Sequence, residues 1–348
     1  MQTFKLLGLP GLAFEQVANK LDAFKIIVLT TVSKKFKRKI QGVKLKVSTL
    51  KWNYPCSINI NSSQGSIGIE ISGSAGGEIK RINGTPVRID TFPINSHQTQ
   101  LFVNPACPSS TRLTVMEDVT IHLLSIFQVR HFNFVLWDKT LNPDISSIFI
   151  WKYCQDFLNF YLCDTLRPQI SPEEMTFLSR NVKAETLHIG KLTTNFQHKE
   201  TFNCKQLELI NPCWATPECL NSDQYTDMII RTQSSTYNHF FNGVLKNWMQ
   251  GRHQKLESFF ATTSLWIGRT TLDGIEQIPT SFSKEELQLR SRYWHPEIGC
   301  VDIRRPTDGR LATVQMSYES ILLLGWHEKH FEHVSEETKT KLRRLKLI

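Results

Sequence analysis

The sequence lacks any long apolar run, which argues against a helix that crosses a membrane. No uninterrupted apolar stretch approaches the roughly 20 residues that such a helix needs. The apolar segment 6–14 is interrupted by Pro10 and followed by Glu15 and Lys20, so it does not match a secretory signal peptide. The 348 residues, 40% hydrophobic and 21% charged, suit a globular protein of about two domains. We therefore expect an intracellular protein, in the cytoplasm, the nucleus or both, with no membrane partner.

Residue patterns typical of catalysis or metal binding are also scarce. The eight cysteines include no C-x-x-C pair, which disfavours zinc ribbons and dithiol redox sites. No G-x-S-x-G, P-loop or H-R-D motif occurs. His327, His330 and His333 recur at three-residue steps, but without an H-E-x-x-H motif we interpret them as part of an exposed face. We expect a protein that is not an enzyme and that holds no cofactor and no metal.

Acidic residues are missing from one segment. Between Ala23 and Ile69 there is no Asp or Glu, whereas nine Lys and Arg residues occur there, which equals the formal net charge of +9 of the whole chain. Such a segment can bind a phosphate backbone, membrane headgroups or an acidic protein. A solvated helix face is the plainer alternative.

The pattern of residues 4–47 predicts three short helices. Pro10 suits the first position of a helix, and apolar residues from Phe14 to Leu21 follow at helical spacing. Asp22 and Ser33 are each placed to cap the N-terminus of a further helix. Helices this short cannot bury their apolar faces alone, so we expect the rest of the chain or a partner to cover them.

The remainder predicts strands mixed with helices. Residues 57–103 alternate as antiparallel strands, with Asn83-Gly84 as a two-residue hairpin turn. From about 115 to 265 short strands alternate with helical stretches. The x-L-x-L pattern at Leu187 recurs 20 residues later, within the range of leucine-rich repeats, although ordinary β–α units explain it equally well.

Helix and turn signals continue toward the C-terminus. Residues 236–251 predict a helix with an aromatic stripe, and Ser171 and Ser283 each precede a Glu by three residues, as in a capping box. The strands 300–305 and 310–316 flank a turn in which Gly309 is expected to adopt a positive φ. The fold class is therefore α+β.

Two groups of motifs resemble a known family, the nematode-type F-box proteins with a C-terminal F-box-associated domain. The N-terminal group resembles an F-box, and the C-terminal group is similar to the associated domain. The F-box-like motifs are Leu6-Leu7-x-Leu9-Pro10, Phe14-x-x-Val17, Leu21-Asp22, Ile26-Ile27 and Val32-Ser33-Lys34-Lys35-Phe36. The C-terminal motifs are Phe240–Met249, Leu256-Glu257, Asp302–Arg305 and Asp308–Val314.

The resemblance implies an arrangement of domains. A three-helix F-box would occupy 1–48 and a small antiparallel connecting region 49–114. An α/β F-box-associated domain, with antiparallel hairpins and leucine-rich-repeat-like β–α units, would occupy 115–335 and bind the target. Residues 336–348 would form a basic tail.

The resemblance also implies a function. The chain would be the substrate-recognition subunit of an SCF-type ubiquitin ligase, bound to a Skp-type adaptor and through it to a cullin, with an unknown protein as target. Because such adaptors are acidic, the basic segment would steer their association. The residues expected to bind the adaptor are Leu9, Pro10, Val17, Leu21, Ile26, Ile27, Val32 and Phe36.

A cluster of arginines beside the turn at Gly309 is the candidate target-binding site. Arg304, Arg305 and Arg310 can match an acidic or phosphorylated motif, because guanidinium groups bind phosphate bidentately. The plainer alternative is that they keep an edge strand soluble. Three other functions stay open: an F-box scaffold that assembles no ligase, a basic nucleic-acid-binding protein, which the sequence disfavours, and an enzyme without a familiar motif.

Overall fold

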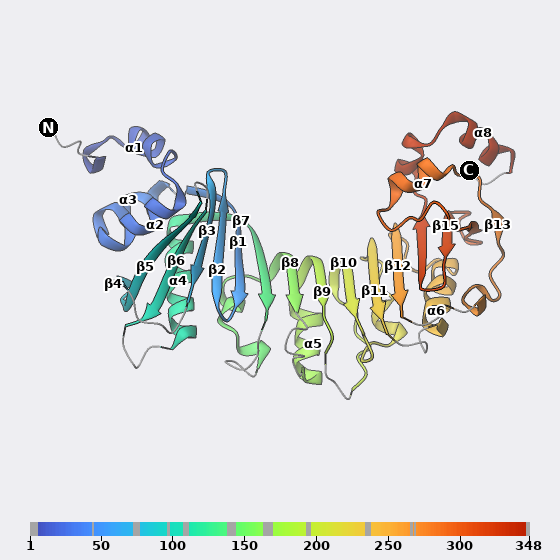
Figure 1. Cartoon of the computed structure of the whole chain (residues 1–348), viewed down its shortest axis with the longest axis horizontal. Coiled ribbons are helices and arrows are strands. Elements are labelled where there is room, and N and C mark those ends of the chain that lie inside the picture. Colours follow the sequence, from blue (N-terminus) through green and yellow to red (C-terminus); the bar gives the residue numbers. More distant parts are fainter. Residues whose placement is uncertain are drawn as a thin grey trace. The chain divides into compact units, whose positions relative to one another are not determined.

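The computed structural model describes residues 6–43, 45–71, 77–95, 98–106, 111–137, 144–162, 170–192, 196–233, 238–264, 267 and 269–345. The chain is a mixed α and β protein, as expected (Figure 1). It divides into two compact units, Met1–Leu166 and Arg167–Ile348. Within the described ranges no helix is both long and apolar enough to cross a membrane.

The three predicted N-terminal helices are present. They follow a short 3-10 helix, η1 (Leu6–Gly8), and are α1 (Gly11–Ala18), α2 (Ala23–Val32) and α3 (Lys34–Val43). Both predicted caps are formed: Asp22 Oδ1 accepts the backbone N–H of Lys25 at 2.7 Å, and Ser33 Oγ accepts that of Phe36 at 3.1 Å.

The sheet of unit 1 mixes parallel and antiparallel strands. Its strand order is β8-β7-β1-β2-β3-β6-β5-β4, in which β8–β7, β7–β1 and β3–β6 are parallel pairs. The predicted turn at Asn83-Gly84 joins β4 to β5, with φ angles of 49° and 95° that suit a tight hairpin. The strands are β1 (Leu45–Tyr54), β2 (Ser57–Ser62), β3 (Gly65–Glu70), β4 (Glu78–Ile82), β5 (Thr85–Asn95), β6 (Gln98–Pro105), β7 (Phe127–Leu136) and β8 (Asp156–Leu162).

Helices α2 and α4 (Arg112–Ile126) pack against this sheet. The indole Nε1 of Trp52 on β1 donates to Thr120 Oγ1 of α4 at 3.0 Å, and Thr30 Oγ1 of α2 lies 2.9 Å from His122 Nε2 of α4. The apolar face of α2 is therefore covered by the chain itself. Unit 1 also contains two 3-10 helices, η2 (Ile145–Ser147) and η3 (Phe149–Lys152).

The domain boundaries expected near residues 48 and 114 both fall inside unit 1. The first lies within β1, and the second lies within the first turn of α4. Strand β7 pairs with β1 along its length, from Leu45 opposite Phe127 to Tyr54 opposite Leu136, so residues beyond 114 complete the sheet that begins at 45. The division between compact units comes later, at Leu166.

The sheet of unit 2 has a parallel half and an antiparallel half. Its order is β13-β14-β15-β16-β12-β11-β10-β9. The neighbours β9–β10, β10–β11 and β11–β12 are parallel, and the neighbours β12–β16, β16–β15, β15–β14 and β14–β13 are antiparallel. The 20-residue recurrence is a parallel pair in which Leu187 of β9 lies opposite Leu207 of β10. The strands are β9 (Lys183–Ile189), β10 (Asn203–Ile210), β11 (Asp227–Thr232), β12 (Ser258–Thr263), β13 (Ile278–Pro279), β14 (Cys300–Arg304), β15 (Leu311–Met316) and β16 (Ser320–Gly325).

The local signals of the C-terminal half are confirmed. Ser171 and Ser283 both form capping boxes, at α5 and α7. The hairpin β14–β15 turns at Gly309, whose φ is 75°, as predicted. The helices of unit 2 are α5 (Pro172–Asn181), α6 (Asn238–Met249), α7 (Lys284–Arg290) and α8 (Glu336–Arg344), with 3-10 helices η4 (Pro217–Leu220), η6 (Arg269–Leu272) and η7 (Glu328–His333).

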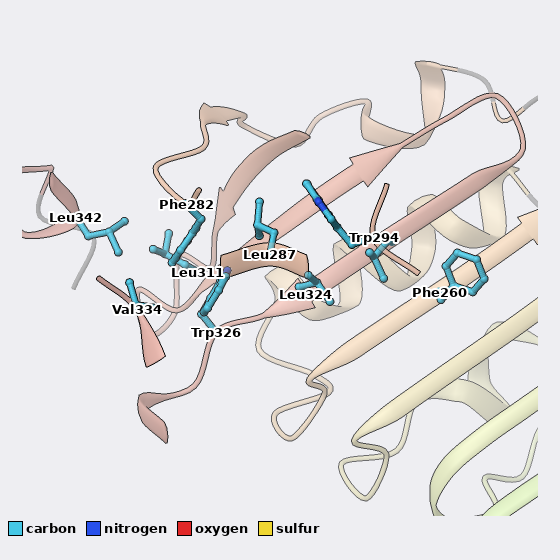
Figure 2. Packing of buried hydrophobic residues seen from close by; sticks show 10 residues of the cluster. Phe260, Phe282, Leu287, Trp294, Leu311, Leu324, Trp326, Val334 and Leu342 are labelled. Atoms are coloured by element: carbon cyan, nitrogen blue, oxygen red, sulfur yellow. The ribbon is translucent and has the colours of Figure 1, made fainter. Parts of the chain in front are cut away.

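A buried cluster joins the antiparallel half of this sheet to α7 and α8 (Figure 2). The rings of Phe282 and Trp326 stack with centroids 3.8 Å apart, and Leu287 and Leu342 belong to the same cluster. Because Leu342 is fully buried, α8 is part of the core of unit 2, and the predicted separate basic tail at 336–348 is corrected accordingly. Residues 346–348 lie outside the described residues.

Candidate functional site

A groove of about 940 Å³ opens on unit 2 beside the turn of the β14–β15 hairpin. Its apolar lining is Leu311, Trp326 and Phe331, of which the first two also belong to the buried cluster in Figure 2. Its lining thus combines apolar surface with charged side chains. The charged residues that line it are Lys255, Glu257, Asp308, Arg310, Glu328 and Lys329.

Arg310 lies in this groove and is held there on two sides. Its backbone N–H donates to Asp308 Oδ1 at 3.1 Å, and its Nη1 donates to the carbonyl of Gln254. The side chain is 28% exposed, and its Nε lies 3.9 Å from Asp308 Oδ2. The guanidinium is therefore oriented by the protein before any ligand binds, while part of it stays open to solvent.

The other two predicted arginines have different surroundings. Arg304 is exposed, and a Cβ on Gly309 would lie 3.3 Å from its Nη2, so its guanidinium lies over the turn. Arg305 is only 1% exposed: its guanidinium carbon lies 4.3 Å from the ring centroid of Trp248, and its Nη1 donates to Asp308 Oδ2 at 3.2 Å. Burial lowers the pKa of Arg305. Arg305 therefore joins the hairpin to α6 and is not available to a target, contrary to the expectation.

Glu257 organises the other side of the groove. Its Oε1 accepts Lys329 Nζ at 2.6 Å, and its Oε2 lies 3.2 Å from His330 Nε2. Burial acts to raise the pKa of Glu257, but the hydrogen bond and charge of Lys329 more than offset it and hold the pKa below its usual value. Burial also lowers the pKa of His330 to about 4, so this imidazole is neutral at pH 7.

The three histidines singled out by their spacing do not form one exposed face as expected, because His330 is buried. His330 Nδ1 accepts the backbone N–H of His327 at 3.1 Å, His327 Nε2 lies 3.2 Å from the carbonyl of Leu256, and His333 is exposed. Across the described ranges no three His, Cys, Asp or Glu residues are grouped as metal ligands.

The sequence did not indicate that Gln254, Glu257 and Lys329 would belong to one groove. They come from the segment before β12 and from η7, which are more than 70 residues apart. Only the antiparallel pairing of β12 with β16 brings the two segments together. No local pattern carries that information.

The N-terminal residues expected to bind the adaptor separate into three groups. Ile26, Ile27 and Phe36 are buried, at 2–4% exposure, and so serve the fold of unit 1 in this structure. The remaining members are Leu9, Val17 and Leu21, which are half-buried, and Pro10 and Val32, which are exposed.

The exposed apolar surface of these helices includes one residue that was not predicted. Leu12 on α1 is 79% exposed, more than Val32 at 59%. Helix α1 is held against α3, because Phe14 packs edge-on against the ring of Phe36 at 5.8 Å and Lys39 Nζ donates to the carbonyl of Leu9 at 2.9 Å. On α3, the side chains of Lys34, Lys35 and Arg38 are exposed.

Comparison with known proteins gives no relative: no family model, no curated protein and no solved structure matches the chain.

Proposed function

We propose that this chain is the substrate-recognition subunit of an SCF-type ubiquitin ligase, in which the N-terminal helices bind a Skp-type adaptor and the groove of unit 2 binds the target. The observation that carries the proposal is the surface of α1–α3. Leu12 and Val32 expose apolar side chains there, while Lys34, Lys35 and Arg38 expose positive charge in a segment that has no carboxylate after Asp22 until Glu70.

An acidic partner with apolar contacts suits this surface. Positive charge on one partner and negative charge on the other accelerate association, whereas exposed apolar side chains contribute to affinity once they are buried. The chain would then hold its target close to the transferring subunits, which raises the effective concentration of the target there. Ubiquitin transfer itself would need no catalytic group in this chain.

The nucleic-acid alternative is less well supported. Exposed cations on α3 favour a phosphate backbone, but base stacking needs accessible aromatic rings. Of the four aromatic residues of the basic segment, Phe36, Trp52 and Tyr54 are at most 3% exposed, and Phe24 is half-buried. A steep fall of affinity with salt for an oligonucleotide, and no binding to an adaptor, would favour this alternative.

Replacing Val32 by Glu, together with Leu12 by Glu, is expected to weaken adaptor binding at least tenfold. Each change places an uncompensated charge in an apolar contact, while both positions are exposed, so folding of unit 1 is retained. Titration of the full chain with a purified Skp-type adaptor measures the effect. Ile26→Glu is a poor test, because Ile26 is buried and the variant would unfold.

The control for this test is Leu289→Glu, because Leu289 on α7 is 80% exposed and belongs to unit 2. It makes the same kind of change, one added carboxylate at an exposed apolar position, and is expected to leave adaptor affinity unchanged. Adaptor binding that is absent in the wild type, or equal in all three proteins, contradicts the proposal.

Replacing Arg304 and Arg310 by Ala is expected to weaken target capture about tenfold, because each guanidinium offers charge-assisted hydrogen bonds to an acidic group. The partners of the wild-type chain, identified after affinity purification, provide the ligand for the titration. Arg344→Ala on α8 removes an exposed arginine elsewhere in unit 2 and serves as the control. If capture by the double variant equals that of the control, these arginines only keep the hairpin soluble.

A further inference from the structure

A cavity of about 410 Å³ lies in unit 1, between α2, α4 and the strands β3–β6. Its charged lining comes from β4 and β5 and includes Lys80, which pairs with Glu78 at 3.3 Å. Thr31 of α2 and Thr91 of β5 add hydroxyl groups to the lining. The rest of the lining is mainly hydrocarbon and includes Ile27 and Val28 from α2, Ile69 from β3, Leu101 from β6, and Val119 and Leu123 from α4.

Among the α4 residues that line the cavity, one side chain is polar. His122 of α4 lines the cavity and is 2% exposed. Its Nε2 lies 2.9 Å from Thr30 Oγ1, whereas its Nδ1 is buried and has no hydrogen-bond partner in the described part of the chain. A buried nitrogen without a partner is costly, so its presence calls for an explanation.

The hydrogen bonds of Thr30 fix the tautomer of this imidazole. The Thr30 hydroxyl donates its one proton to the carbonyl of Ile27 at 2.8 Å, so its oxygen accepts a proton from His122 Nε2. Nδ1 then carries a lone pair and is an acceptor. Burial lowers the pKa of His122 to about 4, which keeps the ring neutral at pH 7.

We propose that this cavity binds a small, mainly apolar molecule that carries one hydrogen-bond donor, a hydroxyl or an amide N–H, and that the donor binds His122 Nδ1. The cavity is almost three times as large as one of about 150 Å³ that takes benzene. Its volume therefore suits two or three fused rings. This inference does not depend on the proposed ligase function.

Water is a poor occupant of the hydrocarbon end of the cavity. A buried water needs two to four polar partners to hold it, and among the lining residues of β3, β6 and α4 His122 alone offers one. Transfer of apolar groups from water to such walls lowers the free energy, and a single donor on the ligand can form the hydrogen bond that the imidazole lacks.

Two probes of similar shape test the proposal on the full chain. 2-Naphthol has two fused rings and one hydroxyl donor, and naphthalene lacks the donor. Fluorescence titration is expected to give saturable binding of both, with 2-naphthol bound about fivefold more tightly, the effect of one hydrogen bond. No saturable binding of either probe overturns the proposal, and equal affinities overturn the role of His122.

Two variants separate the cavity from its polar group. His122→Leu is expected to remove the preference for 2-naphthol while naphthalene still binds. Val28→Phe fills part of the cavity from α2 and is expected to weaken the binding of both probes at least tenfold. Val32→Phe makes the same change at an exposed position of α2 and is expected to leave both affinities unchanged. Because Val28 is half-buried, this variant decides the question even if His122→Leu does not fold. Undiminished binding by Val28→Phe overturns the proposal.

Discussion

Trp326→Ala is expected to lower the free energy of unfolding of unit 2 by about 3–5 kcal/mol, the cost of emptying a large aromatic site in a core. The ring is 2% exposed, stacks on Phe282 with 5° between the planes, and has the guanidinium carbon of Arg290 5.3 Å from its centroid. The surrounding core can collapse little into the gap, because its residues on β15 and β16 are held in place by the pairing of these two strands in the sheet.

The same substitution breaks a buried hydrogen-bond chain. Trp326 Nε1 donates to Thr313 Oγ1 at 2.9 Å, and Thr313 Oγ1 donates to Asp302 Oδ1 at 2.6 Å. Asp302 is fully buried and also accepts the backbone N–H of Ser281 at 3.2 Å. Burial raises the pKa of Asp302, which makes each donor to its carboxylate valuable.

Urea unfolding of the full chain, monitored by amide exchange in β15 and β16, measures the loss in the free energy of unfolding of unit 2. Trp326→Phe keeps most of the packing and loses only the indole donor, so its loss is expected to be smaller, about 1–3 kcal/mol. Tyr318→Ala removes an aromatic ring that is 77% exposed and is expected to change stability by less than about 0.5 kcal/mol. A loss for Trp326→Ala no larger than that of Tyr318→Ala would show that the cluster does not hold unit 2 together.

What the sequence predicted correctly is local. The caps at Asp22, Ser33, Ser171 and Ser283 and the positive φ of Gly309 each depend on residues within four positions. A polar side chain facing a helix N-terminus, or a glycine in a tight reversal, is favoured by the neighbouring backbone alone. Such signals survive in any tertiary context.

What the sequence did not predict depends on distant partners. The pairing of β1 with β7 joins residues about 80 positions apart. Because of this pairing, the first compact unit extends to Leu166, past the expected boundaries near 48 and 114. Arg305 looked like its exposed neighbour Arg304, yet it is buried against Trp248 of α6. The groove has the same origin, since Arg310 meets Gln254 across more than 50 residues. The alternation of apolar and polar residues along a strand indicates on which face of the sheet a side chain lies, but it does not indicate which other element packs against that face.

Acidification is expected to destabilise unit 1 through His122. Burial is the main cause that lowers its pKa to about 4 in the folded chain, with the charge of Lys37 adding to it, whereas the unfolded chain has the ordinary value of 6.5. Above pH 6.5 the imidazole is neutral in both states and contributes no pH dependence. Between pH 6.5 and 4 the unfolded chain binds a proton that the folded chain does not, so the free energy of unfolding falls as the pH falls.

The expected loss from this one group is about 2 kcal/mol at pH 5 and about 3 kcal/mol below pH 4. Amide exchange of α4, corrected for its intrinsic pH dependence, reports the free energy of opening of unit 1 at pH 7 and pH 5. His122→Gln cannot titrate and should lose most of the difference between the two values, while His333→Gln, at an exposed position of η7, should keep it. An equal difference in the wild type and His122→Gln would mean that the imidazole of His122 is as easily protonated in the folded chain as in the unfolded one. In that case the ring would be accessible to water, and its Nδ1 would not be the buried acceptor on which the cavity's choice of ligand depends.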